Sequence, residues 1–227
     1  MLDKTDFYYP IQKMVDYLPL IDWDNDGRAS ITVPTGHWLY EPYKLAVRFQ
    51  GTPFAKFLDI IPFEYGEVRL MKMSPGTCYR AHADIDDRLH INLTANEHCH
   101  LIDLNANKMY PIKSDGYVYK MDGSGIHTAV NFGSTDRVQL VLRVPLKEYD
   151  VEDGVYCSIK FINPPHDLRY KLDQHISPLL NQYVKSGDLG YFNRESDTKF
   201  LLNISQDALN TVVDKLEQAG IDFSITR

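Results

Sequence analysis

Short β-prone runs, each ended by a glycine or proline turn, fill most of the chain up to Pro145. Residues 31–66 alone contain four prolines and three glycines. Prolines and glycines at this density exclude long helices or strands. Many short strands separated by such turns predict a sandwich or a barrel. We therefore expect residues 1–150 to form a mainly β domain.

Alternation of apolar and polar residues locates individual strands. In residues 89–94 the apolar side chains alternate with His90, Asn92 and Thr94. This pattern predicts a half-buried strand whose polar face either lines a site or meets solvent. Residues 138–144 are largely apolar and predict a buried strand that Pro145 ends. We also expect strands at 46–49, 67–73, 79–83, 109–112 and 116–121, and short helices at 11–18 and 54–61.

The composition changes after Pro145. Residues 147–154, KEYDVEDG, read as a charged linker. Beyond them we expect a strand (155–162), a helix that Pro178 interrupts (166–185), a hairpin (189–193 and 199–204), a helix capped by Ser205 that ends near Ala219, and a last strand (221–226). This order is the split βαβ or ferredoxin-like pattern. Residues 151–227 are therefore predicted to form a small α+β ferredoxin-like domain that recruits substrate, forms a dimer interface or covers a site.

Charge and cysteine content narrow the class of protein. The net charge of −7 and the pI of about 5.6 argue against a surface that binds nucleic acid by neutralising phosphates. Three widely spaced cysteines suggest no disulfide framework and fit a reducing cytosol. The first ten residues lack the apolar core of a signal peptide, and no stretch approaches the ~18 apolar residues that span a membrane. We expect a cytoplasmic protein; its oligomeric state is open.

Three residues with side chains that can bind a metal ion stand at a spacing that is compatible with one metal site. His82 and Asp84 are two residues apart, so on a strand both would leave the same face. His127 follows the glycine-rich turn at 122–125. Two imidazoles and one carboxylate can form the facial triad of a non-haem iron(II) oxygenase. A chain of this composition contains about one His-x-Asp pair by chance. The alternative interpretation is therefore that His82 and Asp84 form a surface pair and that His127 is a loop histidine.

Arg137 adds a possible anion clamp, since it stands ten residues after His127. A fixed guanidinium can hold a carboxylate with two parallel hydrogen bonds. Beside an iron with open coordination positions, such a clamp indicates an oxygenase that uses a 2-oxo acid as co-substrate.

Several other residues that could bind a ligand or a metal also have an ordinary structural interpretation. Trp38, Tyr40 and Tyr43 either pack in the core or form a wall of a substrate pocket. The run 98–100, His-Cys-His, lacks a partner cluster at zinc spacing, so we expect Cys99 to pack inward and the histidines to face outward. The acidic loop 22–27 lacks the full pattern of a calcium site.

Three stretches carry a resemblance to a known family: VRLMKMSPGTCYRAHAD, RLHINLTAN and GIHTAVNFGSTDRVQLVLRV. Together they span roughly a third of the chain, from about Glu67 to Val144. This segment resembles the aspartyl/asparaginyl β-hydroxylases and the related free-proline hydroxylases, which are iron(II)- and 2-oxoglutarate-dependent oxygenases. The family's arginyl-x-histidyl pair corresponds to Arg88 and His90, and its later arginine to Arg137.

The resemblance implies a double-stranded β-helix of the jelly-roll or cupin kind. It implies Fe(II) held by His82, Asp84 and His127. It also implies 2-oxoglutarate held by Arg137 at the far carboxylate and by Arg88 and His90 near the metal. The expected reaction hydroxylates an amino acid, or an aspartyl, asparaginyl or prolyl residue of a peptide, and releases succinate and CO2.

At two positions the sequence differs from some members of the family. Some animal relatives have glycine at the position of Asp84, so this chain is more similar to the bacterial enzymes with a full triad. Asn92 stands where relatives often have proline or glycine, which leaves the substrate open. Two other classes also stay open: a cupin-like metalloprotein that does not use 2-oxoglutarate, and a non-catalytic binding protein.

Overall fold

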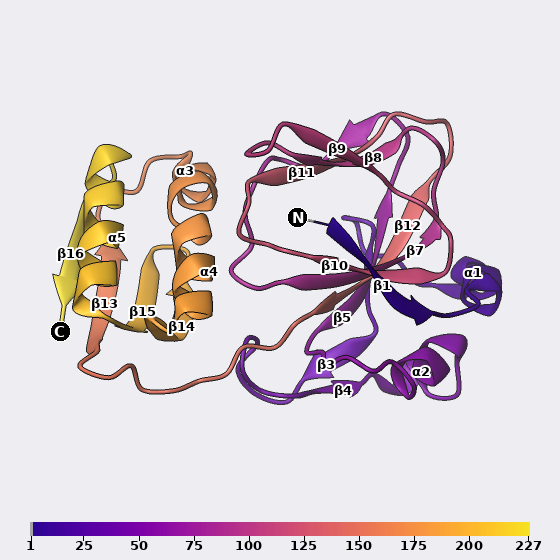
Figure 1. The fold of residues 1–227 in the computed structure, drawn as a ribbon, viewed down its shortest axis with the longest axis horizontal. Helices are drawn as coiled ribbons and strands as arrows, with labels where there is room; N and C mark the ends of the chain where they lie inside the picture. The colour runs from indigo at the N-terminus through magenta and orange to yellow at the C-terminus, as the bar shows by residue number, and fades with distance from the viewer. Residues whose placement is uncertain (1) are drawn as a thin grey trace. The chain divides into compact units, whose positions relative to one another are not determined.

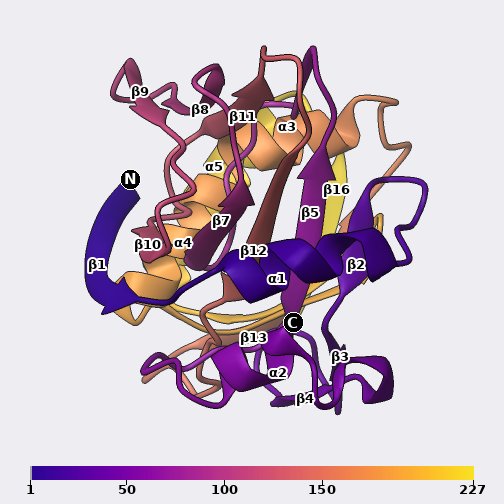
Figure 2. The same ribbon diagram turned by 90° about the vertical axis from the view of Figure 1, so that its right-hand side faces the viewer.

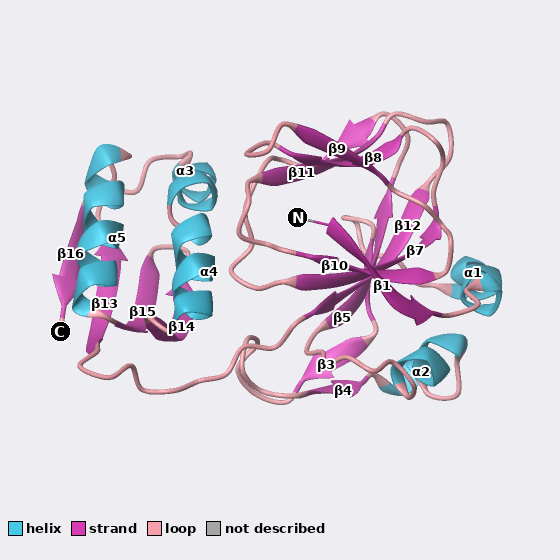
Figure 3. Cartoon of the chain, in the orientation of Figure 1, coloured by secondary structure: helices cyan, strands magenta, loops and turns pink. Residues whose placement is uncertain are grey.

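A computed structural model describes residues 2–227, which fold into two compact units. The first unit comprises residues 2–80, 86–122 and 127–145, and the second comprises 81–85, 123–126 and 146–227. Two short segments that precede Pro145, 81–85 and 123–126, thus belong to the second unit. Each unit has its own sheets and helices (Figure 3).

Two antiparallel sheets face each other in the first unit (Figure 1). The larger sheet has the order β1 (Leu2–Tyr8), β10 (Tyr117–Met121), β7 (Arg88–Thr94), β12 (Arg137–Arg143), β5 (Val68–Met73), β2 (Arg28–Ser30). The smaller sheet has the order β6 (Thr77–Cys78), β11 (His127–Asn131), β8 (Cys99–Asp103), β9 (Lys108–Pro111). A separate hairpin joins β3 (Thr32–Pro34) and β4 (Tyr43–Leu45). Two facing antiparallel sheets are the jelly-roll arrangement that the sequence predicts.

The larger sheet buries its apolar face under helices. Leu89 and Ile91 of β7 pack with Leu140 and Leu142 of β12 in one core cluster. Residues of α1 (Gln12–Tyr17) and α2 (Pro53–Leu58) belong to the same cluster, and Figure 2 shows α1 crossing in front of β5 and β12. Each such side chain contributes about 1.5–3 kcal/mol when it is fully buried. The predicted strands at 67–73, 89–94 and 138–144 and both predicted helices of this unit are therefore confirmed.

The opposite face of β7 and β12 is polar and yet buried. It carries His90 and Asn92 on β7, and Arg137 and Gln139 on β12. Asn92, Arg137 and Gln139 are at most 5% exposed. Burying polar groups is costly unless they are hydrogen-bonded, so this face is where a polar ligand would be accommodated.

Two predicted strands are wrong. Residues 46–49 contain a 3₁₀ helix, Val47–Phe49, because Phe49 and Gln50 bond locally to the carbonyls of Ala46 and Val47. The predicted strand 79–83 does not form: β6 ends at Cys78, Tyr79 makes one more bond to Ala129 O, and beyond it only His82 forms an isolated β-bridge. A further 3₁₀ turn covers Leu18–Leu20. The strands β1, β2, β3, β4, β8 and β11 were not predicted.

The C-terminal part of the second unit has the predicted order of elements. It contains β13 (Val155–Phe161), α3 (Leu168–His175), α4 (Ser177–Ser186), β14 (Leu189–Ser196), β15 (Lys199–Ile204), α5 (Gln206–Gln218) and β16 (Phe223–Thr226). Its antiparallel sheet has the order β14-β15-β13-β16. Pro178 stands at the start of α4, so the predicted interruption of the first helix is confirmed. Within residues 2–227, the helices are too short or too polar to cross a membrane.

Candidate metal centre

His82 and Asp84 lie in the loop between β6 and β7 and not, as the sequence predicted, within a strand. The loop leaves the smaller sheet after Tyr79, whose backbone N–H donates to Ala129 O at 2.9 Å. Beyond that point the backbone takes its partners from segments that are distant in the sequence. The N–H of Asp84 donates to Gly123 O at 2.9 Å, which joins the two inserted segments of the second unit.

Helices α3 and α4 hold the same loop within the second unit. The Ala83 N–H donates to Asp173 O at 3.3 Å. The side chain of Gln174 donates to Ala81 O at 2.8 Å. From α4, the fully buried Asn181 donates from Nδ2 to Asp84 O at 3.0 Å. Side chains thus fix the backbone on both sides of His82.

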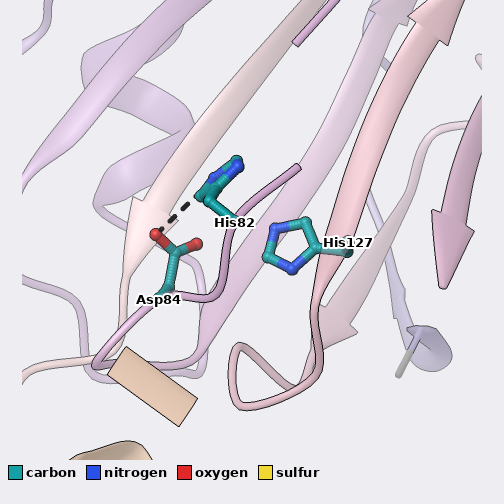
Figure 4. A group of neighbouring side chains, drawn as sticks. All are labelled: His82, Asp84 and His127. Carbon is teal, nitrogen blue, oxygen red and sulfur yellow. Dashed lines mark ion pairs between the residues drawn. The ribbon is translucent and has the colours of Figure 1, made fainter. Parts of the chain in front are cut away.

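The structure brings the three predicted ligands together (Figure 4). One ligand atom each from His82, Asp84 and His127 lies within 4.8 Å of the others, and this group is the candidate metal cluster of residues 2–227. His82 Nε2 is 3.9 Å from Asp84 Oδ1. Ligand bonds to a first-row metal are about 2.0–2.2 Å long, so one ion can reach all three atoms after small side-chain movements. Two imidazoles and one carboxylate are the donor set of a facial triad.

The three side chains differ in burial. His127 opens β11 opposite Asp103 of β8 and is 4% exposed. The His82 and Asp84 side chains are 31% and 20% exposed. The cluster is therefore enclosed at His127 and partly accessible to solvent at the other two side chains.

Arg137 is a buried cation without an acidic partner. It is 2% exposed, and no carboxylate among the described residues forms an ion pair with it. Its Nη1 contacts Met73 Sδ at 3.8 Å, its Nη2 donates to Gln139 Oε1, and its Nε has no hydrogen-bond partner. Burial lowers the pKa of Arg137. An uncompensated buried charge is strongly destabilising, and an anionic ligand would remove that cost.

His90 is connected to Arg137 through Gln139. His90 Nδ1 lies 3.3 Å from Gln139 Nε2, and Gln139 Oε1 accepts from Arg137. Sequence reasoning missed Gln139, because it stands inside the apolar run VQLVLRV. Its spacing of two from Arg137 was the available signal, since residues i and i+2 of a strand share a face.

Arg88 has a different environment. It forms an ion pair with Asp86, and Arg143 Nε lies 3.5 Å from Asp86 Oδ2. The sheet register places Arg88 opposite Arg143, whereas Arg137 lies at the other end of β12, opposite Met73. The structure therefore brings together Arg137 and His90, and it pairs Arg88 with an acid of the protein.

The remaining candidates have structural partners. Asn92 donates to Lys113 O at 3.3 Å. Cys99 is buried with its thiol 3.3 Å from Asn131 Oδ1, and His98 is exposed, as predicted. His100, which was also expected to face outward, is half-buried and its Nδ1 is enclosed. The Arg143 guanidinium packs over the ring of Trp38 at 4.3 Å.

Several solved structures share limited similarity with the chain. A viral collagen prolyl hydroxylase from Paramecium bursaria Chlorella virus-1 is 12% identical, with 63% of this chain and 94% of that chain covered and a TM-score of 0.40. A predicted oxalate decarboxylase from Thermotoga maritima is 18% identical, with 56% and 100% covered and a TM-score of 0.31. The capsular polysaccharide assembling protein CapF from Staphylococcus aureus is 12% identical, with 52% of this chain but only 31% of that longer protein covered, and a TM-score of 0.31. These scores are too low to decide the fold, which the sheet topology describes by itself.

A family model gives the more specific match. Residues 54–145 match the model of aspartyl/asparaginyl beta-hydroxylase. The matched range contains His82, Asp84 and His127 as well as Arg88, His90 and Arg137. A comparison with curated proteins finds no match.

Proposed function

Because residues 54–145 belong to the aspartyl/asparaginyl β-hydroxylase family, we propose that this protein is an iron(II)- and 2-oxoglutarate-dependent hydroxylase. The observation that carries the proposal is the convergence of His82, Asp84 and His127 within 4.8 Å. The proposed substrate is a free amino acid, or an aspartyl, asparaginyl or prolyl residue of a peptide, and the proposed products include succinate and CO2.

Each proposed role follows from the chemistry of the side chain. His82, Asp84 and His127 would hold iron(II) by two imidazole nitrogens and one carboxylate oxygen. Arg137 would bind the far carboxylate of 2-oxoglutarate, since its buried charge has no acidic partner among the described residues. His90 would bind the carboxylate next to the metal. The same role for Arg88 is proposed on the family motif alone.

Iron(II), when bound, would let dioxygen oxidise 2-oxoglutarate to succinate and CO2 and, with its other oxygen atom, hydroxylate an unactivated C–H bond of the substrate. The protein would contribute orientation and buried polar side chains. The buried polar face of β7 and β12 fixes the carboxylates, and side chains such as Asn181 hold the loop that carries two ligands. For the C-terminal part of the second unit we propose the ferredoxin-like class, which its element order and antiparallel sheet support.

The proposal is tested by adding 2-oxoglutarate to the protein and iron(II) without oxygen. We expect a weak visible charge-transfer band that saturates with 2-oxoglutarate. After oxygen is admitted, we expect succinate to form and one oxygen atom to be gained by the right member of a panel of amino acids and peptides. A protein that binds iron but gives neither the band nor succinate is a metalloprotein of another kind. One that binds no metal is a binding protein.

A further inference from the structure

Gln139 lies between two side chains of the proposed co-substrate site. It is 3% exposed and stands two residues after Arg137 on β12, so both side chains leave the same face. In the register of β7 and β12, Gln139 pairs with Asn92 and the next residue on its face, Val141, pairs with His90. His90 is therefore a diagonal neighbour of Gln139, which is within reach of a long side chain.

The direction of the hydrogen bonds is set by Arg137. A guanidinium has N–H donors and no acceptor, so the amide atom of Gln139 that faces it must be the carbonyl oxygen. Oε1 holds that position and accepts from Arg137 Nη2. The amide NH2 then faces His90 Nδ1 at 3.3 Å. Because an NH2 group can only donate, Nδ1 must accept.

This bond determines where the imidazole carries its hydrogen. A neutral histidine has one protonated and one bare ring nitrogen. With Nδ1 as acceptor, the hydrogen of His90 is on Nε2, and the bond made by one ring nitrogen fixes the state of the other. An imidazolium would place an N–H against the NH2 of Gln139, so this state is disfavoured.

We propose that Gln139 is a positioning residue for the co-substrate, because its amide orients Arg137 and fixes His90 as the Nε2–H tautomer, a donor for the carboxylate. This inference rests on the proposed use of 2-oxoglutarate. The neutrality of the amide is essential to it. A glutamate of the same shape would neutralise Arg137 and would accept a hydrogen from His90 Nδ1, which would turn Nε2 into an acceptor.

The tautomer can be measured without metal or turnover. In metal-free protein, nitrogen-15 NMR of the histidine rings distinguishes a bare Nδ1 from a bare Nε2. We expect the Nε2–H form at His90 in the wild type and the Nδ1–H form or the imidazolium in Gln139→Glu, with the signal assigned by its loss in His90→Asn. Gln139→Met has a similar volume and no polar atoms, so it should abolish the preference for one tautomer.

Co-substrate affinity provides the second measurement. We expect Gln139→Glu to raise the KM for 2-oxoglutarate about tenfold to a hundredfold, the effect of losing one hydrogen bond to a charged group. The kcat at saturation should change little, which is the pattern of lost ground-state binding. Gln218→Glu is the control, because it adds the same charge at an exposed position of α5.

The outcomes separate the two proposals. If the wild type consumes no 2-oxoglutarate, the proposed function fails, whatever the NMR result. If the wild type consumes it, yet His90 has the same tautomer and the KM is unchanged in Gln139→Glu, the role of Gln139 is wrong. Should Gln139→Glu fail to fold, Gln139→Met gives both readouts, and an unchanged tautomer with an unchanged KM again overturns the inference.

Discussion

Asp86 and Arg88 form an ion pair inside the protein, with side chains that are 1% and 3% exposed. Removing one partner of such a pair leaves an uncompensated buried charge, which costs about 3–5 kcal/mol. We expect Asp86→Asn to lower the free energy of unfolding by about this amount, measured by urea denaturation. The double variant Asp86→Asn with Arg88→Met should cost less than the sum of the two single changes. Strict additivity would mean that the two charges do not stabilise each other.

The metal ligands can be tested by binding alone. We expect His127→Ala and Asp84→Ala each to lose iron(II) binding, because two remaining ligands no longer form a facial triad. Metal content after anaerobic loading and gel filtration is the measurement. His98→Ala is the matched control, since this histidine is exposed and outside the cluster. If His127→Ala retains one equivalent of iron, the proposed triad is wrong.

Arg137 should affect the co-substrate and not the metal. We expect Arg137→Met to retain iron(II) and to weaken 2-oxoglutarate binding by about 2–5 kcal/mol, the cost of truncating a buried charge partner. The anaerobic charge-transfer titration gives the affinity. Arg169→Met serves as the control, because the Arg169 side chain is 61% exposed on α3. An unchanged affinity in Arg137→Met would contradict the clamp.

Asn181 should control the order of the ligand loop. Its Nδ2 donates to Asp84 O, and we expect Asn181→Ala to remove about 1 kcal/mol of local stability. Hydrogen exchange at the Ala83 and Asp84 amides should become several-fold faster, while the exchange of β12 stays unchanged. Gln182→Ala, a change at the exposed neighbouring position of α4, should leave both unchanged. Equal exchange in the two variants would show that Asn181 does not hold the loop.

Tyr119 gives an alkaline pH dependence. Burial, followed by the hydrogen bond to Asp115 and its charge, raises the pKa of Tyr119 from 10.0 to about 12. The folded state thus keeps a proton that the unfolded state loses, so this stabilisation is complete below pH 10 and disappears as the pH rises toward 12. We expect urea denaturation to show a smaller loss of stability over this range in Asp115→Asn. The control Asp136→Asn, at an exposed position, should lose as much stability as the wild type over this range. An equal loss of stability in the wild type and in both variants would contradict the assignment.

The sequence predicted best where one physical pattern dominates. The alternation around Leu89 and the apolar run after Arg137 identified β7 and β12, because one face of each strand packs in the core. Pro178 identified the break between α3 and α4. β1 was missed because its residues, LDKTDFY, alternate weakly and pair only with β10, at the edge of the sheet.

The sequence predicted that three side chains would converge, but it did not predict the local structure that carries two of them. His82, Asp84 and His127 converge, but the first two do so from a loop whose backbone partners are distant in sequence, such as Gly123 and Asn181. No local pattern encodes those contacts. Gln139 was missed for the opposite reason, since its neighbours are so apolar that the strand reads as a pure core strand.

The pairing of β1 with β10, in which Leu2 lies opposite Met121, has a consequence for synthesis on the ribosome. The residues of β1 are made well before those of β10, their hydrogen-bonding partner. The nascent strand therefore spends that interval with unpaired backbone groups, which are a template for wrong association. Its charges at Asp3, Lys4 and Asp6 reduce that hazard, since charged side chains are what natural proteins use to protect exposed strand edges.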